Sequence, residues 1–329
     1  MWSGIGFALA AGMLWGLVFV CPLLLDDYPA LMLAFARHVA FGAIALPLAW
    51  HNRAALAGLR RADWLEALGL ALVGNLLYYG LLAGAIQRSG APLPSVIIGT
   101  LPVVLPVVAN LFNHRADGRV TWRSLAPSLA LMCAGLLCVN QGELEHLAHE
   151  SRAGLLRHGA GALLTLGALA CWIWYAIRNT RWLRANPRFP PQAWATAYGL
   201  CTLPAALACF AGLWISDAAA GGALQMPLGP RPLLFAALML GMALLPSWLG
   251  NACWNLASQR LPTALMGQLT IFEALSGLGY AFMLRGIWPP ALTLAGVGLL
   301  LAGVLAGTRI RFVAPGPACA GRGNAPRRA

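Results

Sequence analysis

One acidic residue lies in a stretch of sequence that is apolar enough to cross a lipid bilayer. Glu273 lies near the middle of the segment from Pro262 to Arg285, which reads PTALMGQLTIFEALSGLGYAFMLR. A carboxylate at bilayer depth is costly, so such residues usually face a bundle interior or a water-filled cavity and act in substrate or proton pathways. We therefore interpret Glu273 as a substrate or proton site. The alternative is a buried carboxylate that hydrogen-bonds a neighbouring helix.

Two further ionisable residues, Arg37 and His38, lie within another apolar stretch, residues 30–50. An arginine at this position can snorkel to the outer interface or meet a carboxylate. We expect snorkelling or a structural bond for Arg37. For His38 we expect the packing role of a hydrogen-bonded histidine rather than a proton relay.

The chain contains no complete signature of a metal site or of ATP hydrolysis. His146 and His149 lie among Glu143, Glu145 and Glu150, but the order HExxH is missing, so we expect a solvated loop rather than a zinc site. The sequence also lacks lysine and a GxxxxGK[ST] motif. We predict neither a metal nor a cofactor, and a gradient or an exchange as the energy source of any transport.

The composition indicates which elements position these residues. Hydrophobic residues make up 60% of the 329 residues and charged residues 10%, which excludes a soluble globular protein with a polar surface. An apolar stretch of about 20 residues spans the hydrocarbon core as a helix. We predict an all-α polytopic membrane protein with ten helices, at residues 3–24, 30–50, 64–86, 92–113, 122–139, 154–177, 193–215, 232–256, 262–284 and 289–309. Pro102 and Pro106 predict a bend in the fourth helix.

The net charge of +12 sets topology rather than indicating a nucleic-acid partner. If the N-terminus is cytoplasmic, most of the 22 basic residues fall in cytoplasmic loops and the tail, among them Arg60, Arg61 and Arg184. Such an excess of arginine in short loops is the positive-inside signature. We therefore predict a multi-pass protein of the cell (inner) membrane with both termini in the cytoplasm.

The second half of the chain repeats features of the first half. Trp15 has a counterpart in Trp172, and the pair Gly74-Asn75 returns as Gly250-Asn251. These matches keep chain order and map helices one to five onto helices six to ten. Because five is odd, the second copy must be inverted in the bilayer. We predict a first repeat at 1–140, an extracytoplasmic linker at 141–153, a second repeat at 154–311 and a disordered basic tail at 312–329.

Several segments carry a family resemblance that covers the chain to about residue 312. They are Trp15-Gly16, Arg37, GTLPVVLPVVA in the fourth helix, and the Gly-rich ALMCAGLLCV and TLAGVGLLLAGVLAG of the fifth and tenth helices. Together they resemble the drug/metabolite transporter superfamily, specifically its EamA-type ten-helix transporters. Glu273 falls where this family often has Glu-Pro, with Ala274 in place of the proline, and Arg285-Gly286 stands where Gly-Glu is common. The segment 252–255, Ala-Cys-Trp-Asn, is similar to the eighth helix of aromatic amino-acid exporters.

The resemblance implies a central cavity lined chiefly by helices one, three, four, six, eight and nine. Aromatic faces bind flat apolar or cationic groups, and amide side chains can orient amino or carboxylate groups. The substrate-binding candidates on these helices are Trp15, Asn75, Tyr78, Tyr79, Thr100, Trp172, Tyr175, Asn251, Trp254, Asn255, Gln268 and Glu273. Such a set suits a small zwitterionic or aromatic metabolite.

We therefore predict a secondary transporter that exports small organic metabolites, amino acids and in particular aromatic ones, by alternating access. In this hypothesis Glu273 exchanges a proton with the external side as substrate leaves. One alternative is an intramembrane enzyme with His38 as its base, although no GxSxG elbow or second acidic dyad accompanies it. Another is a non-transporting packing partner, in which Gly303 and Gly307 on the last helix serve a second protein or a homodimer.

Overall fold

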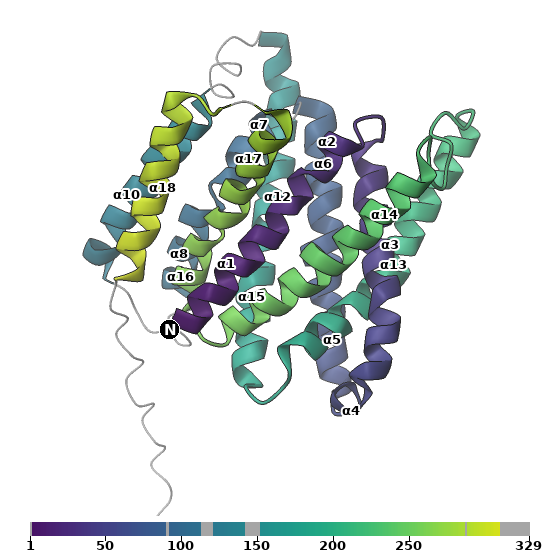
Figure 1. The fold of residues 1–329 in the computed structure, drawn as a ribbon, viewed down its shortest axis with the longest axis horizontal. Helices are drawn as coiled ribbons and strands as arrows, with labels where there is room; N and C mark the ends of the chain where they lie inside the picture. Colours follow the sequence, from purple (N-terminus) through teal and green to yellow (C-terminus); the bar gives the residue numbers. More distant parts are fainter. Residues whose placement is uncertain (1, 90–91, 113–120, 142–151, 287, 310–329) are drawn as a thin grey trace, which may run out of the picture.

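The computed structural model describes residues 2–89, 92–112, 121–141, 152–286 and 288–309. The regular secondary structure of these residues is helical throughout, and the helices form a single bundle (Figure 1). The segment with His146 and His149, nearly all of the expected linker, and the expected tail lie outside the described residues.

The described helices form ten crossings, as the sequence predicts. Eight are long and apolar enough to cross a membrane as continuous segments. The first crossing contains α1 (Trp2–Gly16) and α2 (Cys21–Leu24), and the third contains α5 (Arg61–Ala71) and α6 (Tyr78–Ser89). The second is α3 (Ala30–His51), followed by the short α4 (Arg53–Leu56). The others are α10 (Trp122–Val139), α12 (Arg152–Ala185), α13 (Pro191–Ala219), α14 (Pro232–Met242) with α15 (Asn251–Ser258), and α18 (Ala291–Thr308).

The fourth and ninth crossings are each broken at a threonine. Thr100 separates α7 (Pro92–Gly99) from α8 (Leu101–Phe112), and Thr270 separates α16 (Thr263–Leu269) from α17 (Ile271–Arg285). Each threonine hydroxyl donates to the carbonyl three residues earlier, at 2.6 Å in both cases. The break in the fourth crossing therefore lies just before the predicted bend at Pro102. Interrupted helices at matching positions of two repeats are typical of transporter binding sites.

The third and eighth crossings carry matching π-helical segments. Leu72–Leu77 joins α5 to α6, and Ala243–Gly250 joins α14 to α15. The wider turn of a π-helix re-aims the side chains that follow it and often marks a functional site. Asn75 lies within the first of these segments, and Asn251 directly follows the second.

The packing of the crossings confirms the two inverted five-helix repeats. Three pairs of equivalent crossings pack on each other, namely α3 with α13, α8 with α16, and α10 with α18. The contacts of the first and sixth crossings also exchange under this equivalence, because α1 packs on α15 while α12 packs on α6. An odd number of crossings per repeat then places the two copies in opposite orientations.

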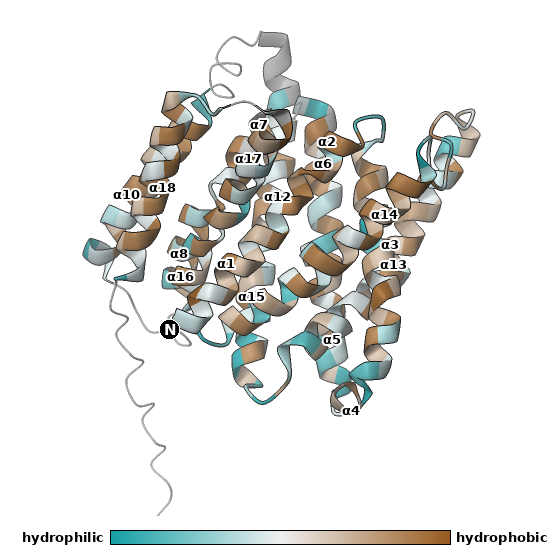
Figure 2. Cartoon of the chain, viewed as in Figure 1, coloured by the Kyte–Doolittle hydropathy of each residue, from teal (hydrophilic) through white to brown (hydrophobic). Residues whose placement is uncertain are grey.

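The outer surface of the bundle is suited to lipid. Figure 2 shows hydrophobic residues along the flanks of the helices and hydrophilic ones gathered at the turns. Large apolar side chains on these flanks are widely exposed, for example Leu163 at 71%, Ile215 at 71% and Leu305 at 61%. Such extensive apolar exposure would be unfavourable in water, whereas it is expected for helices surrounded by hydrocarbon.

A polar clamp joins the turn before α3 to the start of α14. The Tyr28 hydroxyl donates to Leu228 O at 2.9 Å and accepts from Arg231 N at 2.8 Å. The Arg231 guanidinium binds Asp27 through two nitrogens and reaches Asp26 at 3.3 Å. The clamp therefore ties the first repeat to the second at the end of the bundle opposite the N-terminus (Figure 1).

We expect acid to weaken this clamp. The hydrogen bond from Arg231 holds the pKa of Asp27 below its ordinary value. A lowered pKa stabilises the folded state above the unfolded carboxyl pKa of about 3.9, and this contribution is lost as pH falls through the folded value. Asp27→Asn should therefore lower the melting temperature in detergent near neutral pH, and this difference from wild type should vanish in acid. A pH-independent difference would contradict the prediction.

Candidate substrate-binding site

A cavity of about 630 Å³, counting its open mouth, lies between the two repeats. Its lining comes from α1, the 3-10 turn Leu17–Phe19 that follows it, α3, α6, α12, α13, α17 and the two π-helical segments with their borders. The lining residues are Trp15, Val18, Arg37, His38, Phe41, Gly74, Asn75, Tyr78, Tyr79, Trp172, Tyr175, Tyr198, Pro246, Ser247, Asn251 and Glu273.

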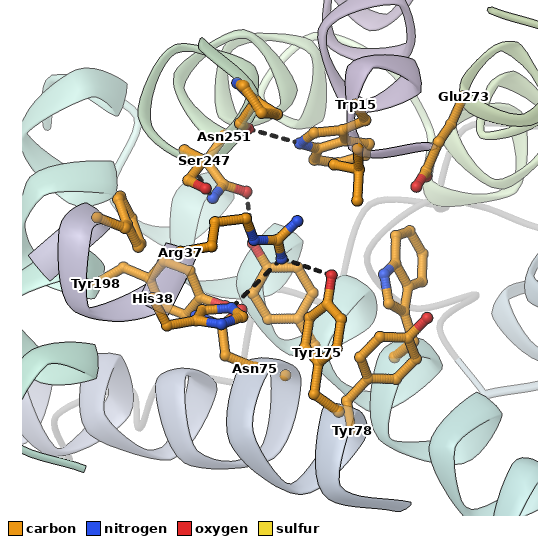
Figure 3. A pocket seen from close by; sticks show the side chains of 16 residues that line it. Trp15, Arg37, His38, Asn75, Tyr78, Tyr175, Tyr198, Ser247, Asn251 and Glu273 are labelled. Atoms are coloured by element: carbon orange, nitrogen blue, oxygen red, sulfur yellow. Dashed lines mark hydrogen bonds between the residues drawn. The ribbon is translucent and has the colours of Figure 1, made fainter. Parts of the chain in front are cut away.

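Eight of the twelve substrate-binding candidates from the sequence line this cavity. They are Trp15, Asn75, Tyr78, Tyr79, Trp172, Tyr175, Asn251 and Glu273. They come from five crossings of both repeats, and Figure 3 shows the side chains of the six that it labels around a common space. The fold thus brings together residues from near the start of the chain, such as Trp15, and from its last fifth, such as Glu273.

Aromatic rings form one wall of the cavity. The rings of Trp15 and Trp172 meet edge to face at 6.3 Å, and those of Tyr175 and Tyr198 lie 5.6 Å apart. The Trp15 indole donates to Pro246 O at 3.0 Å, which fixes the ring against the opposite repeat. Pro246 lies within the π-helical segment of the eighth crossing. The wall is therefore a rigid surface suited to an apolar or aromatic group.

Two asparagines hold tyrosines of this wall in place. The Tyr198 hydroxyl donates to Asn75 Oδ1 at 2.6 Å, and the Tyr175 hydroxyl donates to Asn251 Oδ1 at 3.4 Å. Asn75 Nδ2 donates in turn to Thr202 Oγ1 at 3.2 Å. In each case an asparagine in or next to the π-helical segment of one crossing accepts a hydrogen bond from a tyrosine hydroxyl of another crossing. The asparagines therefore act first by positioning the tyrosines.

The charged residues of the lining are Arg37 and Glu273, with His38 beside them. Glu273 lies one turn beyond the break in the ninth crossing and is half-buried. Its carboxylate makes no hydrogen bond or ion pair with the described part of the chain. Arg37 turns into the cavity rather than snorkelling to the outer interface, and its Nη2 donates to the Tyr79 hydroxyl.

Four candidates lie outside the cavity lining, each for a packing reason. Thr100 closes the turn at the break in the fourth crossing. Trp254 is 1% exposed and packs behind Trp15, with ring centres 5.1 Å apart. Gln268 donates to Ser128 Oγ at 3.0 Å and joins α16 to α10. Asn255 belongs to the closed layer described next.

A buried polar network closes the bundle between the cavity and the end that carries the N-terminus. Asn179 Nδ2 donates to Asn255 Oδ1 at 2.9 Å, and the Trp194 indole donates to Asn179 Oδ1 at 2.8 Å. Asn255 Nδ2 donates to Pro191 O at 3.2 Å. These three side chains are at most 2% exposed. The network joins α12, α13 and α15 of the second repeat.

Asn255→Leu should destabilise the protein without touching the cavity. The change leaves the buried amide hydrogens of Asn179 without their acceptor, which costs about 1–3 kcal/mol. We expect a lower melting temperature in detergent. Asn186→Leu is the matched control, because Asn186 directly follows α12, is partly exposed and donates to Trp182 O of the preceding turn. Equal melting temperatures for the two variants would contradict the prediction.

Sequence reasoning missed part of the lining for identifiable reasons. Phe41 and Tyr198 lie on helices that the resemblance does not place at the cavity, and Ser247 reaches it only because the eighth crossing becomes π-helical before Asn251. Arg37 had a signal in the sequence, since an ionisable residue at membrane depth is a candidate in its own right. His38 does satisfy its Nδ1 on Ala34 O, at 2.7 Å.

Comparison with known proteins gives three similarities. Residues 2–141 match the model of a family described as the EamA-like transporter family. The inner membrane protein YtfF of Escherichia coli (strain K12) is 48% identical over 316 residues, which cover 94% of this chain and 96% of that protein. A crystal structure of another protein superposes with a TM-score of 0.69 over 93% of this chain and 96% of that chain. At 14% identity, this last similarity concerns the fold alone.

Proposed function

Because the chain belongs to the EamA-like transporter family, we propose that it is a secondary transporter that exports small organic metabolites, in particular amino acids and among them aromatic ones, by alternating access. Its proposed location is the inner membrane, with both termini in the cytoplasm as the arginine distribution predicts. Glu273 is the proposed site of proton exchange. Membership in a family of transporters makes the chain a transporter rather than an enzyme.

One observation carries the proposal. The cavity combines a guanidinium, a carboxylate without a bonded partner among the described residues, and an aromatic wall, and it lies between two inverted repeats. This combination supports binding of a molecule with an amino group, a carboxylate and an apolar side chain. The similarity of residues 252–255 to aromatic amino-acid exporters supports an aromatic side chain, although Trp254 itself packs behind the wall.

Alternating access requires that one side of the site be closed while the other is open. Between the cavity and the end of the bundle that carries the N-terminus, Trp194, Trp254 and Leu261 are each 1% exposed. This layer supports a conformation closed on that side. Rocking of one repeat against the other would open it, as in other inverted-repeat transporters.

Counterflow in sealed vesicles tests the proposal. Purified protein is reconstituted into liposomes loaded with one unlabelled amino acid at a time, and uptake of the labelled compound is followed. We expect uptake above that of protein-free liposomes for at least one aromatic or aliphatic amino acid. Absence of counterflow across the whole panel would reject the amino-acid proposal.

The packing-partner alternative loses its main support. A side chain at Gly303 would meet Met132 Cγ at 2.6 Å, and a side chain at Gly307 would collide with Gln268. Both glycines therefore face neighbouring helices of the same chain rather than an external partner. The homodimer stays a prediction, and the transport unit proposed is one chain.

A further inference from the structure

The Arg37 guanidinium has more donors than partners. Its Nη2 donates to the Tyr79 hydroxyl and lies 3.4 Å from His38 Nε2. Its Nε is buried and has no hydrogen-bond partner among the described residues. A guanidinium carries five N–H donors and keeps its charge in proteins. Nη1 also has no hydrogen-bond partner among the described residues and, unlike Nε, it is not buried, so its hydrogens are available to an acceptor in the cavity.

No carboxylate of the described residues contacts this cation, although Glu273 attracts it from the same cavity. Glu273 is the carboxylate among the described lining residues, and it makes no ion pair with Arg37 within 4.0 Å. An unpaired charge away from bulk water is costly. A ligand carboxylate would remove this cost, because its two oxygens match the planar fork of a guanidinium.

Neighbouring groups hold Arg37 ready for such a ligand. The guanidinium carbon lies 4.9 Å from the centre of the Tyr79 ring, and the His38 ring is fixed by its bond to Ala34 O. Because the Tyr79 hydroxyl accepts from Arg37, its own hydrogen can donate to a second acceptor. A carboxylate at this point could therefore receive hydrogen bonds from both side chains without prior rearrangement.

From these contacts we infer that Arg37 and the Tyr79 hydroxyl form the carboxylate subsite, while Glu273 receives the ammonium group. The inference rests on the proposed transport function and deepens it. It makes the cavity selective for zwitterions over amines or acids of the same size. The rings of Trp15 and Trp172 would cover the apolar part of the ligand.

Three probes that differ in one charged group test the inference. They are phenylalanine, phenethylamine, which lacks the carboxylate, and 3-phenylpropionate, which lacks the ammonium group. Binding to detergent-solubilised protein is measured by titration calorimetry. In wild type, loss of the carboxylate should weaken binding by about tenfold or more, as expected for a charge-assisted pair. Arg37→Gln should weaken the binding of phenylalanine and of 3-phenylpropionate by a similar factor. It should leave the affinity for phenethylamine unchanged.

Two further variants separate charge from shape and position. Arg37→Lys keeps the charge but loses the fork, so its affinity for the acids should lie between wild type and Arg37→Gln. Arg88→Gln is the matched control, because Arg88 is exposed and donates to Gly84 O of its own helix. This variant should bind all three probes as wild type does.

Several outcomes would overturn the inference. The first is that the wild-type protein binds phenethylamine as tightly as phenylalanine, and the second is that it binds none of the probes. The third is that a folded Arg37→Gln variant keeps full affinity for 3-phenylpropionate. If Arg37→Gln does not fold, the wild-type series decides. Counterflow of phenethylamine without preference for carboxylates would overturn the subsite while transport stands. Absence of counterflow for any compound would instead reject the proposed function.

Discussion

Glu273→Gln is expected to abolish proton-driven transport in proteoliposomes while the protein stays folded. Glutamine keeps the size of the side chain but cannot take up or release a proton. The carboxylate has no hydrogen-bond or ion-pair partner in the described part of the chain, so the change removes no structural bond. An imposed pH gradient should therefore no longer alter the transport rate, whereas counterflow without a gradient should persist at a reduced level.

Glu66→Gln makes the same chemical change outside the cavity. Glu66 pairs with Arg178 through two nitrogens, at 2.6 and 2.8 Å. Half of the Arg178 side chain is exposed, so the loss of this pair should have a small effect on stability. Transport by this control should still follow the pH gradient. Folded Glu273→Gln protein with an unchanged response to the gradient would reject proton coupling through Glu273.

The number of crossings and their orientation can be predicted from local features of the sequence. Apolar length and the placement of arginine predict the ten crossings, and an odd number of crossings per repeat requires inversion. The breaks at Thr100 and Thr270 are harder to foresee, because each depends on a hydroxyl that bonds a carbonyl three residues earlier. The π-helical segments are equally hidden, since their sequences are as apolar as the helices around them.

The cavity is predicted less completely, because lining depends on which face of each helix points inward. Asn75 and Asn251 were found from residue type, since a lipid-facing amide is unfavourable. The same rule selected Asn255 and Gln268, whose amides bond to neighbouring helices instead. A buried amide satisfies the rule in either setting. Periodicity alone cannot separate the two settings, because the third, eighth and ninth crossings, which carry these amides, all contact several neighbours.

The position of Glu273 depends on close packing between the first and ninth crossings. Helix α1 packs along α17, and two glycines of α1 face it. A Cβ added at Gly12 would lie 2.8 Å from Phe272 Cβ and 3.1 Å from Glu273 N. A Cβ added at Gly16 would lie 2.6 Å from Ser276 Cβ and 2.8 Å from Gly277 N. Small residues at this spacing let two helices approach closely in the membrane.

Gly16→Ala and Gly6→Ala should therefore change stability in opposite directions. At Gly6 an added Cβ meets nothing within 4 Å, so the gain in helix propensity should stabilise the protein by up to about 1 kcal/mol. At Gly16 the Cβ would collide with backbone atoms of α17, and overpacking costs roughly 1–3 kcal/mol. We expect Gly16→Ala to lower the melting temperature in detergent and to reduce counterflow, because separating the helices displaces Glu273. Equal stability of the two variants would show that α1 and α17 do not pack as closely as described.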